Sequence, residues 1–139
     1  MTIGIKYSLH HELAKAPAYS NLTDGAMDLT AVTAEANDKY IEYDTGVKLA
    51  IPAGYVGLVF PRSSISNVAL ILSNSVGVID HNYSGTIKFR FRGLGNPNVY
   101  QVGDRIGQII IIPRPQIELE LIEDVADINT RDGFGSTGV

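Results

Sequence analysis

Asp80 and Tyr83 are the side chains of this sequence best placed to do chemistry, because a sharp bend is predicted where they lie. They stand between two short apolar arms, at 76–79 and 86–89, among residues that bend the backbone cheaply: Asn82, Ser84 and Gly85. The pattern predicts a β-hairpin with a loop longer than two residues. At its tip, a carboxylate could act as a base and an aromatic ring could stack on a ligand. An Asp that closes a turn and a half-buried Tyr would give the same pattern.

A second group of polar side chains is suited to phosphate. Pro61 is followed by one arginine and two serines: Arg62, Ser63 and Ser64. The planar guanidinium offers paired donors to phosphate oxygens, and the serines add hydroxyl and backbone donors. An ordinary polar turn after a strand would have the same composition. The glycine-rich end at 131–139 could wrap phosphates with successive N–H groups, or it could be a frayed tail.

The elements that must position these groups are almost all β-strands. The sequence has 14 glycines and 6 prolines, and they separate short runs rich in Ile, Val and Tyr. We expect strands within the following segments: 3–7, 40–51, 54–60, 69–72, 109–112 and 117–122. The runs at 69–72 and 109–112 are predicted to be buried on both faces, whereas 117–122 alternates and would have one wet face. One helical turn is possible at 31–37.

Charged and aromatic residues alternate along the segment that follows the bend. Lys88, Arg90 and Arg92 would point to one face of a strand, and Phe89 and Phe91 to the other. We expect the charged side chains to form a solvated face and the rings to lie in the core.

Composition excludes several other classes of protein. The chain has 139 residues, a net charge of −4 and no cysteine, so disulfide frameworks and thiolate zinc sites are ruled out. No basic tract suggests nucleic-acid binding, and no apolar run is long enough for a membrane span. The adjacent His10 and His11 lack a third ligand at regular spacing, so we expect surface residues. The N-terminal residues do not resemble a signal peptide. We expect a cytoplasmic protein, or one of the host cytoplasm if the source is viral.

The stretch GVIDHNYSG, at 77–85, resembles the third signature motif of the dUTPases, usually written Gly-x-Ile-Asp-x-Asp-Tyr-x-Gly. Four further segments resemble the other motifs in the family's order: 25–29, 61–64, 103–108 and 131–139. The sequence departs from the family at a few positions. Gly25 and Ala26 stand in reversed order, Asn82 replaces the second aspartate, and Asn129 stands where an arginine is usual. Whether Arg131 replaces that arginine is left open.

The resemblance implies an all-β fold, a jelly-roll-like β-barrel, assembled as a homotrimer with three sites at subunit interfaces. It implies a barrel domain at 1–127 and a flexible, glycine-rich C-terminal arm at 128–139 that closes over the active site. The implied activity is hydrolysis of dUTP to dUMP and pyrophosphate, which supplies thymidylate synthesis and keeps uracil out of DNA. The implied cofactor is Mg²⁺, held mainly by the substrate phosphates, with Asp28 contributing through water.

The resemblance also assigns roles to single residues. Asp80 would activate the water that attacks the α-phosphorus, and Tyr83 would pack under the deoxyribose. Four positions would form the uracil pocket: Asn74, Gly77, Val78 and Ile79. The phosphates would be bound by Arg62, Ser63, Ser64 and Gln108. The arm would contribute Arg131, Phe134, Gly135, Ser136 and Thr137.

Two alternatives remain at this stage. The dCTP deaminases resemble the dUTPases in fold and bend, but they carry a glutamate where this chain has Arg90. A non-enzymatic regulatory or interaction protein with a degenerate site is the other alternative. Asp80, Tyr83 and Arg62 argue against it, whereas the altered arm keeps it open.

Overall fold

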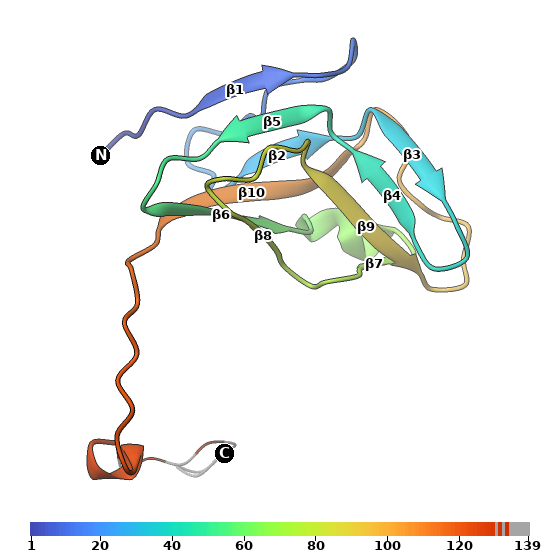
Figure 1. Ribbon diagram of the computed structural model, residues 1–139. Coiled ribbons are helices and arrows are strands. Elements are labelled where there is room, and N and C mark those ends of the chain that lie inside the picture. Colours follow the sequence, from blue (N-terminus) through green and yellow to red (C-terminus); the bar gives the residue numbers. More distant parts are fainter. Residues whose placement is uncertain (130, 132, 134–139) are drawn as a thin grey trace.

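The protein folds into three antiparallel sheets, seen in the computed structural model of Figure 1. The structure describes residues 1–129, 131 and 133. The two-stranded sheet pairs β1 (Lys6–Leu9) with β5 (Val47–Ala50). One four-stranded sheet has the order β2 (Met27–Thr30), β10 (Arg105–Pro113), β6 (Tyr55–Phe60), β8 (Gly77–Ile79). The other has the order β3 (Thr33–Ala36), β4 (Ile41–Asp44), β9 (Lys88–Gly93), β7 (Leu70–Leu72). The described residues also contain two short 3-10 helices, η1 (Ser63–Asn67) and η2 (Val125–Asp127). The prediction of an all-β fold is confirmed.

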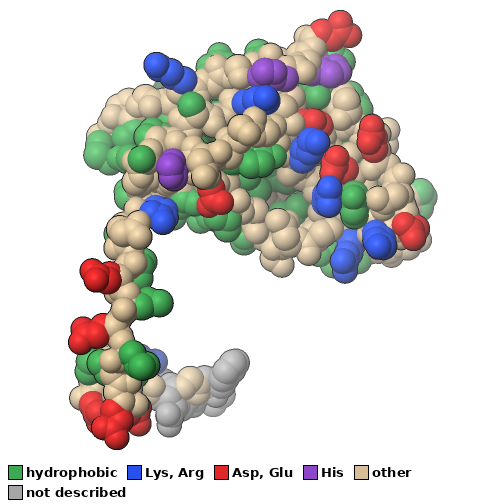
Figure 2. Space-filling model, in the orientation of Figure 1, with side chains coloured by type: hydrophobic (Ala, Val, Ile, Leu, Met, Phe, Trp, Pro, Cys, Tyr) green, Lys and Arg blue, Asp and Glu red, His purple; other side chains and the backbone are tan. Residues whose placement is uncertain are grey.

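The core lies between the two four-stranded sheets and contains side chains from both. Phe89 and Phe91 of β9 stack with ring centroids 6.1 Å apart, and Tyr43 of β4 meets Phe91 edge-on. All three rings are at most 1% exposed. The opposite face of β9 is exposed, and Figure 2 shows basic and acidic side chains mixed on that side of the molecule. The alternation predicted for 88–92 is therefore confirmed.

The predicted hairpin at 76–89 is wrong in its pairing. β8 pairs with β6, whereas β9 pairs with β4 and β7 in the other sheet. The bend at Asp80–Tyr83 therefore carries the chain from one sheet to the other. Local pattern locates the turn, but it does not decide which strands the two arms join, because that depends on pairing with residues distant in sequence.

Three other predicted elements differ from the structure. The possible helical turn at 31–37 is strand β3, because Thr33–Ala36 pairs with β4 and this pairing overrides weak local propensity. Only parts of the two buried runs are inaccessible. Ile71 of β7 is 54% exposed, and Ile112 near the end of β10 is 38% exposed. β7 lies at a sheet edge, so one of its faces is left uncovered.

The predicted strand at 117–122 is also wrong within the single chain. After β10 the chain runs away from the body of the molecule to η2 (Figure 1). Leu119 and Leu121 are 92% and 98% exposed. The alternating pattern is present, but no neighbouring strand of the described residues lies beside it. Among the described helices, none has the length and apolar character needed to cross a membrane.

Candidate functional site

Three of the predicted site residues meet at one corner of the first four-stranded sheet. Asp28 of β2 stands opposite Gln108 of β10, which in turn stands opposite Phe60 at the end of β6. The chain then turns through Pro61 into η1, and the Gln108 side-chain amide donates to the Pro61 carbonyl oxygen at 3.0 Å. This pairing brings the Arg62 guanidinium beside Asp28, with 2.8 Å between Nε and Oδ1.

The Asp28 carboxylate accepts from three donors. Arg62 binds Oδ1, while the Ser20 hydroxyl and Nη1 of Arg105 bind Oδ2 at 2.7 and 3.1 Å. Burial works to raise the pKa of Asp28, but the Ser20 hydrogen bond and the two guanidinium groups outweigh burial and lower this pKa below its usual 3.8. The carboxylate is therefore ionised at neutral pH. Two guanidinium groups around one carboxylate leave the corner with a net positive charge.

Sequence analysis missed two members of this corner, Arg105 and Ser20. Arg105 belongs to the segment 103–108, where an Asp–Arg pair directly after a glycine indicates only a turn. Only the pairing of β10 with β2 brings Arg105 opposite Thr30 and its guanidinium within reach of Asp28. Nothing in the local sequence around Ser20 marks it as a partner of Asp28.

The two serines of the phosphate segment differ in their surroundings. Ser63 begins η1 and is exposed. Ser64 is partly buried, and its hydroxyl accepts from Nη1 of Arg62 at 3.2 Å. Within the described chain, the hydrogen bonds of Arg62 use Nε and Nη1, which leaves Nη2 to reach a ligand. The corner can therefore offer a guanidinium and hydroxyl groups to an anion.

The bend between the two sheets holds the second group of predicted residues. The Tyr83 backbone N–H donates to the Asp80 carbonyl at 3.1 Å, and the Tyr83 hydroxyl donates to the Thr86 carbonyl at 2.8 Å. These bonds fold the ring over Gly85, where an added Cβ would lie 2.5 Å from the Tyr83 hydroxyl oxygen. Asp80 itself is exposed. The bend therefore fixes an aromatic ring and presents a carboxylate to solvent.

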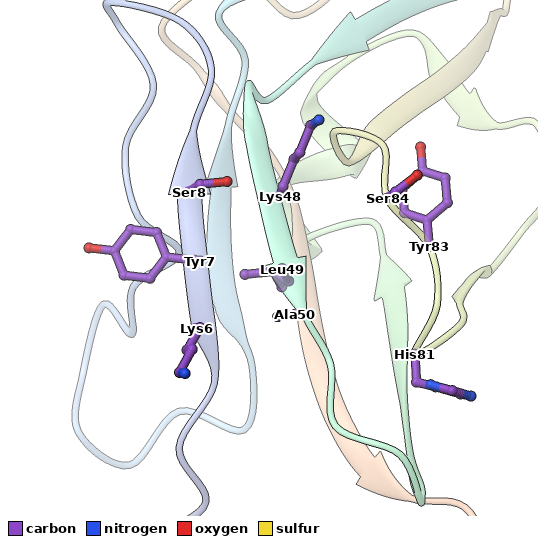
Figure 3. A pocket seen from close by; sticks show the side chains of 9 residues that line it. All are labelled: Lys6, Tyr7, Ser8, Lys48, Leu49, Ala50, His81, Tyr83 and Ser84. Atoms are coloured by element: carbon purple, nitrogen blue, oxygen red, sulfur yellow. The ribbon is translucent and has the colours of Figure 1, made fainter.

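Two surface pockets adjoin the bend. One, of about 410 Å³, lies between β1, β5 and the bend, where Figure 3 shows Lys48 and Tyr83 pointing the same way and His81 pointing away from them. The other, of about 250 Å³, is lined by Asp80 and His81 together with Tyr55, Val56, Asn82 and Arg114. A ligand at the bend therefore has room on either side of the chain.

The predicted uracil positions lie on and before β8. Gly77 is buried against Val59, and the Asn74 side-chain amide lies 3.6 Å from the position of an added Cβ at Gly77. Val78 is 62% exposed and Ile79 partly buried. β8 is the edge strand of its sheet. Backbone donors and acceptors on its outer side are consequently available to a ligand.

Within one chain, the phosphate corner and the bend are far apart. Asp28 belongs to one edge strand of the sheet, and Asp80 follows the other edge strand. Continuing the register of β8 by one residue puts Asp80 opposite Val56 of β6, which pairs with Ile112 of β10. Ile112 is four residues along β10 from Gln108, the partner of Asp28. Three strand spacings of ~4.8 Å and four residues of ~3.3 Å separate the two Cα atoms by ~19 Å. One triphosphate does not join both groups of a single chain.

The arm positions can be described only in part. Arg131 is exposed, while Phe134, Gly135, Ser136 and Thr137 lie outside the described residues. Among the residues described, no three His, Asp or Glu side chains form a metal-binding cluster. His10 shares a hydrogen bond with the Ser8 hydroxyl.

Arg90 stands at the position of the deaminase glutamate. It is bound to Glu42 at 2.7 Å and lies over the Tyr40 ring.

The described residues thus form an antiparallel, all-β fold, with an arginine–serine corner at one edge strand of a sheet and an exposed carboxylate next to the other edge strand. Residues 14–138 match the family model described as dUTPase. The chain therefore belongs to the dUTPase family, and the predicted family and enzyme class are confirmed.

Similar proteins agree with this placement. The chain is 36% identical over 145 residues to the deoxyuridine 5'-triphosphate nucleotidohydrolase of Syntrophotalea carbinolica. The alignment covers 99% of this chain and 98% of that protein. It is 35% identical to the same enzyme of Escherichia phage T5, over 84% of this chain and 78% of that protein. The dUTPase of Staphylococcus bacteriophage 80alpha, solved as a mutant with dUpNHpp, has a TM-score of 0.82 at 24% identity, covering 99% and 100% of the two chains. This last similarity concerns the fold.

Proposed function

We propose that this protein hydrolyses dUTP to dUMP and pyrophosphate, with Asp80 as the general base. The observation that carries the proposal is the exposed Asp80 carboxylate, fixed next to Tyr83 by the bend, in a chain of the dUTPase family. Asp80 accepts a proton from a water molecule, and the resulting hydroxide oxygen attacks the α-phosphorus. The bond to the bridging oxygen breaks, and pyrophosphate leaves with that oxygen.

The base and the sugar are bound at the bend. Backbone groups of the edge strand at Gly77, Val78 and Ile79 read the uracil edge, with Asn74 shaping the pocket. Once a bound base excludes water from these groups, cytosine would leave them unpaired, a mismatch that can be worth about 10⁴-fold or more in discrimination. The Tyr83 ring packs under the deoxyribose and leaves no room for a 2′-hydroxyl. The hydrogen bond from Tyr83 to Thr86 supports this role, because it holds the ring in one place.

The phosphates are bound at the corner by Arg62, Ser63, Ser64 and Gln108, where positive charge offsets the charge of the leaving pyrophosphate. When bound, Mg²⁺ would be held mainly by the substrate and would supply further charge stabilisation. The residues fit an outer-sphere role toward the ion. Asp28 already accepts from three donors, which leaves about one acceptor position of its carboxylate for a metal-bound water. Asp28 therefore orients Arg62, and it would also accept from a water of the ion when Mg²⁺ is bound.

The complete site forms between copies of the chain in a homotrimer. The ~19 Å between the bend and the corner of one chain supports a site in which one subunit provides Asp80 and a second provides Arg62. The apolar side chains of 117–122 give further support. Leu119 and Leu121 are almost fully exposed in the single chain, and a neighbouring copy would cover them and complete the barrel domain of residues 1–127.

The C-terminal arm, residues 128–139, closes over the nucleotide from the third subunit. Phe134 covers the uracil, Ser136 and Thr137 reach the terminal phosphates, and Gly135 permits close approach of the backbone. Arg131 provides the one guanidinium in the sequence of the arm. In the cytoplasm, the product dUMP supplies thymidylate synthesis, and removal of dUTP keeps uracil out of DNA.

Substitution Asp80→Asn tests the proposal, because an amide cannot accept the proton. We expect pyrophosphate release from dUTP to fall by about 10²- to 10⁴-fold with the melting temperature unchanged. Asp38→Asn, at an exposed position between β3 and β4, is the matched control and should retain wild-type turnover. Full activity of the Asp80 variant would refute the assignment. Release of ammonia from dCTP by the wild-type protein would favour deamination instead.

A further inference from the structure

The Tyr100 hydroxyl is buried and finds no hydrogen-bond partner among the described residues. The side chain is 6% exposed, and its ring packs edge-on against Tyr43 and Phe91. A phenylalanine would fill the same space without burying a polar group. An unpaired buried hydroxyl costs free energy, so its presence in the aromatic core calls for a role outside the packing of the ring.

Two of the polar groups that act on this hydroxyl, Ser64 and Arg62, belong to the arginine–serine corner. Burial raises the pKa of Tyr100, and Asp104 adds to the rise, while the Ser64 hydroxyl and the Arg62 charge oppose it. The phenol therefore stays protonated at neutral pH and can serve as a donor. The Ser64 hydroxyl is close enough to act on the Tyr100 hydroxyl, but the two do not meet the geometry of a hydrogen bond. A small movement on ligand binding that brings the two oxygens within hydrogen-bond distance, with the Arg62 contact kept, would form this bond.

The hydrogen-bonding capacity of Ser64 decides what such a bond would do. A serine hydroxyl has one proton to donate and two positions that accept. Arg62 already occupies one accepting position through Nη1, at 3.2 Å from Oγ. A second donor would fill the other position, and the single serine proton would then have to point away from the protein groups, toward a ligand.

We propose that Tyr100 is a positioning residue that donates to Ser64 Oγ when the triphosphate binds. With Arg62 and Tyr100 both donating, the Ser64 hydroxyl is committed to donating to a phosphate oxygen. The Tyr100 hydroxyl thus has no hydrogen-bond partner among the described residues of the free protein, and it gains one in the complex. The inference rests on the proposed function, because it assumes that Ser64 binds phosphate.

A double-mutant cycle of Tyr100→Phe and Ser64→Ala tests this role. Tyr100→Phe should leave the melting temperature unchanged or slightly raised, because it removes an unpaired buried hydroxyl. We expect kcat/KM for dUTP and the affinity for dUpNHpp each to fall by about 3- to 10-fold, the factor typical of one hydrogen bond. In the Ser64→Ala background, the same substitution should have no further effect on either quantity. Such coupling would support the positioning role, since a merely structural effect would persist in both backgrounds.

Tyr43→Phe is the matched control, because Tyr43 belongs to the same aromatic cluster and its hydroxyl donates to the Tyr100 carbonyl oxygen at 2.8 Å. It should lower stability and show no coupling to Ser64. The inference is overturned if Tyr100→Phe retains wild-type kcat/KM, or if its loss is equally large with and without Ser64. It is also overturned if Ser64→Ala itself has no effect. None of these outcomes affects hydrolysis of dUTP by the wild-type protein. The proposed function is tested separately, by the Asp80→Asn variant.

Discussion

Arg62 Nε lies 2.8 Å from Asp28 Oδ1, although 34 residues separate the two along the chain. Their side chains are only 22% and 13% exposed, so the pair is largely shielded from water. Arg105 approaches the other carboxylate oxygen. Asp28 thus fixes two guanidinium groups that would otherwise repel each other, and under the proposed function this arrangement would be ready for the triphosphate before it binds.

The pH dependence of stability tests the Asp28 network. The pKa of Asp28 in the folded protein is below its usual 3.8. The network therefore contributes stability that is present above about pH 4 and is lost as pH falls through the lowered pKa. Asp28→Asn should be less stable than wild type by about 1–3 kcal/mol at pH 7. The difference should shrink toward zero in strong acid.

Urea unfolding followed by circular dichroism at pH 7, 4 and 3 measures this difference. Asp38→Asn, which removes an exposed carboxylate, should show no comparable loss at any pH. A constant gap between wild type and Asp28→Asn across the whole range would mean that the carboxylate charge is not what stabilises the corner.

The sequence predicted the local features of the fold well, and it failed where a feature depends on distant partners. Alternation of Phe89 and Phe91 with basic residues identified a half-buried strand, because side-chain direction follows from strand geometry alone. The turn at Asp80–Tyr83 was likewise located correctly. Its two arms, however, pair with β6 and with β4 and β7, and no local pattern encodes that choice.

The same distinction applies to the candidate site. Asp28, Arg62 and Gln108 were identified one motif at a time, by resemblance to a family, and the structure brings them together. Arg105 and Ser20 were missed as partners of Asp28, because their contacts arise only when β10 pairs with β2. The apolar alternation at 117–122 was recognised, but a strand needs a neighbouring strand, and the described residues of one chain provide none there.

Gly85→Ala tests whether the Tyr83 ring selects deoxyribose. A Cβ at this position would lie 2.7 Å from Cζ of Tyr83, so the ring must move. We expect kcat/KM for dUTP to fall by about 10-fold or more and the preference for dUTP over UTP to narrow. Gly93→Ala is the matched control, because a Cβ there meets nothing within 4 Å. If the Gly85 variant keeps the wild-type preference, the ring is not the sugar gate.

Truncation after Thr130 tests the C-terminal arm. The segment 131–139 has one large apolar side chain, Phe134, among glycines and small polar residues, so it contributes little to a hydrophobic core. Removing it should preserve the trimer in analytical ultracentrifugation and also the melting temperature. Pyrophosphate release should fall by about 10²-fold or more, because the arm's contacts to the triphosphate are lost. Wild-type turnover of the truncated protein would show that these residues are only a tail.

Mixing two inactive variants tests whether Asp80 and Arg62 act from different subunits. Asp80→Asn lacks the base, and Arg62→Ala lacks the phosphate ligand, so each homotrimer should be inactive. In mixed trimers, an Arg62→Ala subunit still has an intact bend, and an Asp80→Asn subunit still has an intact corner. Where this bend meets this corner, the interface contains a wild-type site. Random reassembly of equal amounts gives this arrangement at about one interface in four, since each subunit is of the required type half of the time. We therefore expect about a quarter of wild-type turnover after the two variants are refolded together. If the folded homotrimers are mixed without exchange of subunits, turnover should stay at the residual level of the two variants. A co-refolded mixture that stays inactive would mean that both residues serve the same subunit, against the ~19 Å that separates bend and corner.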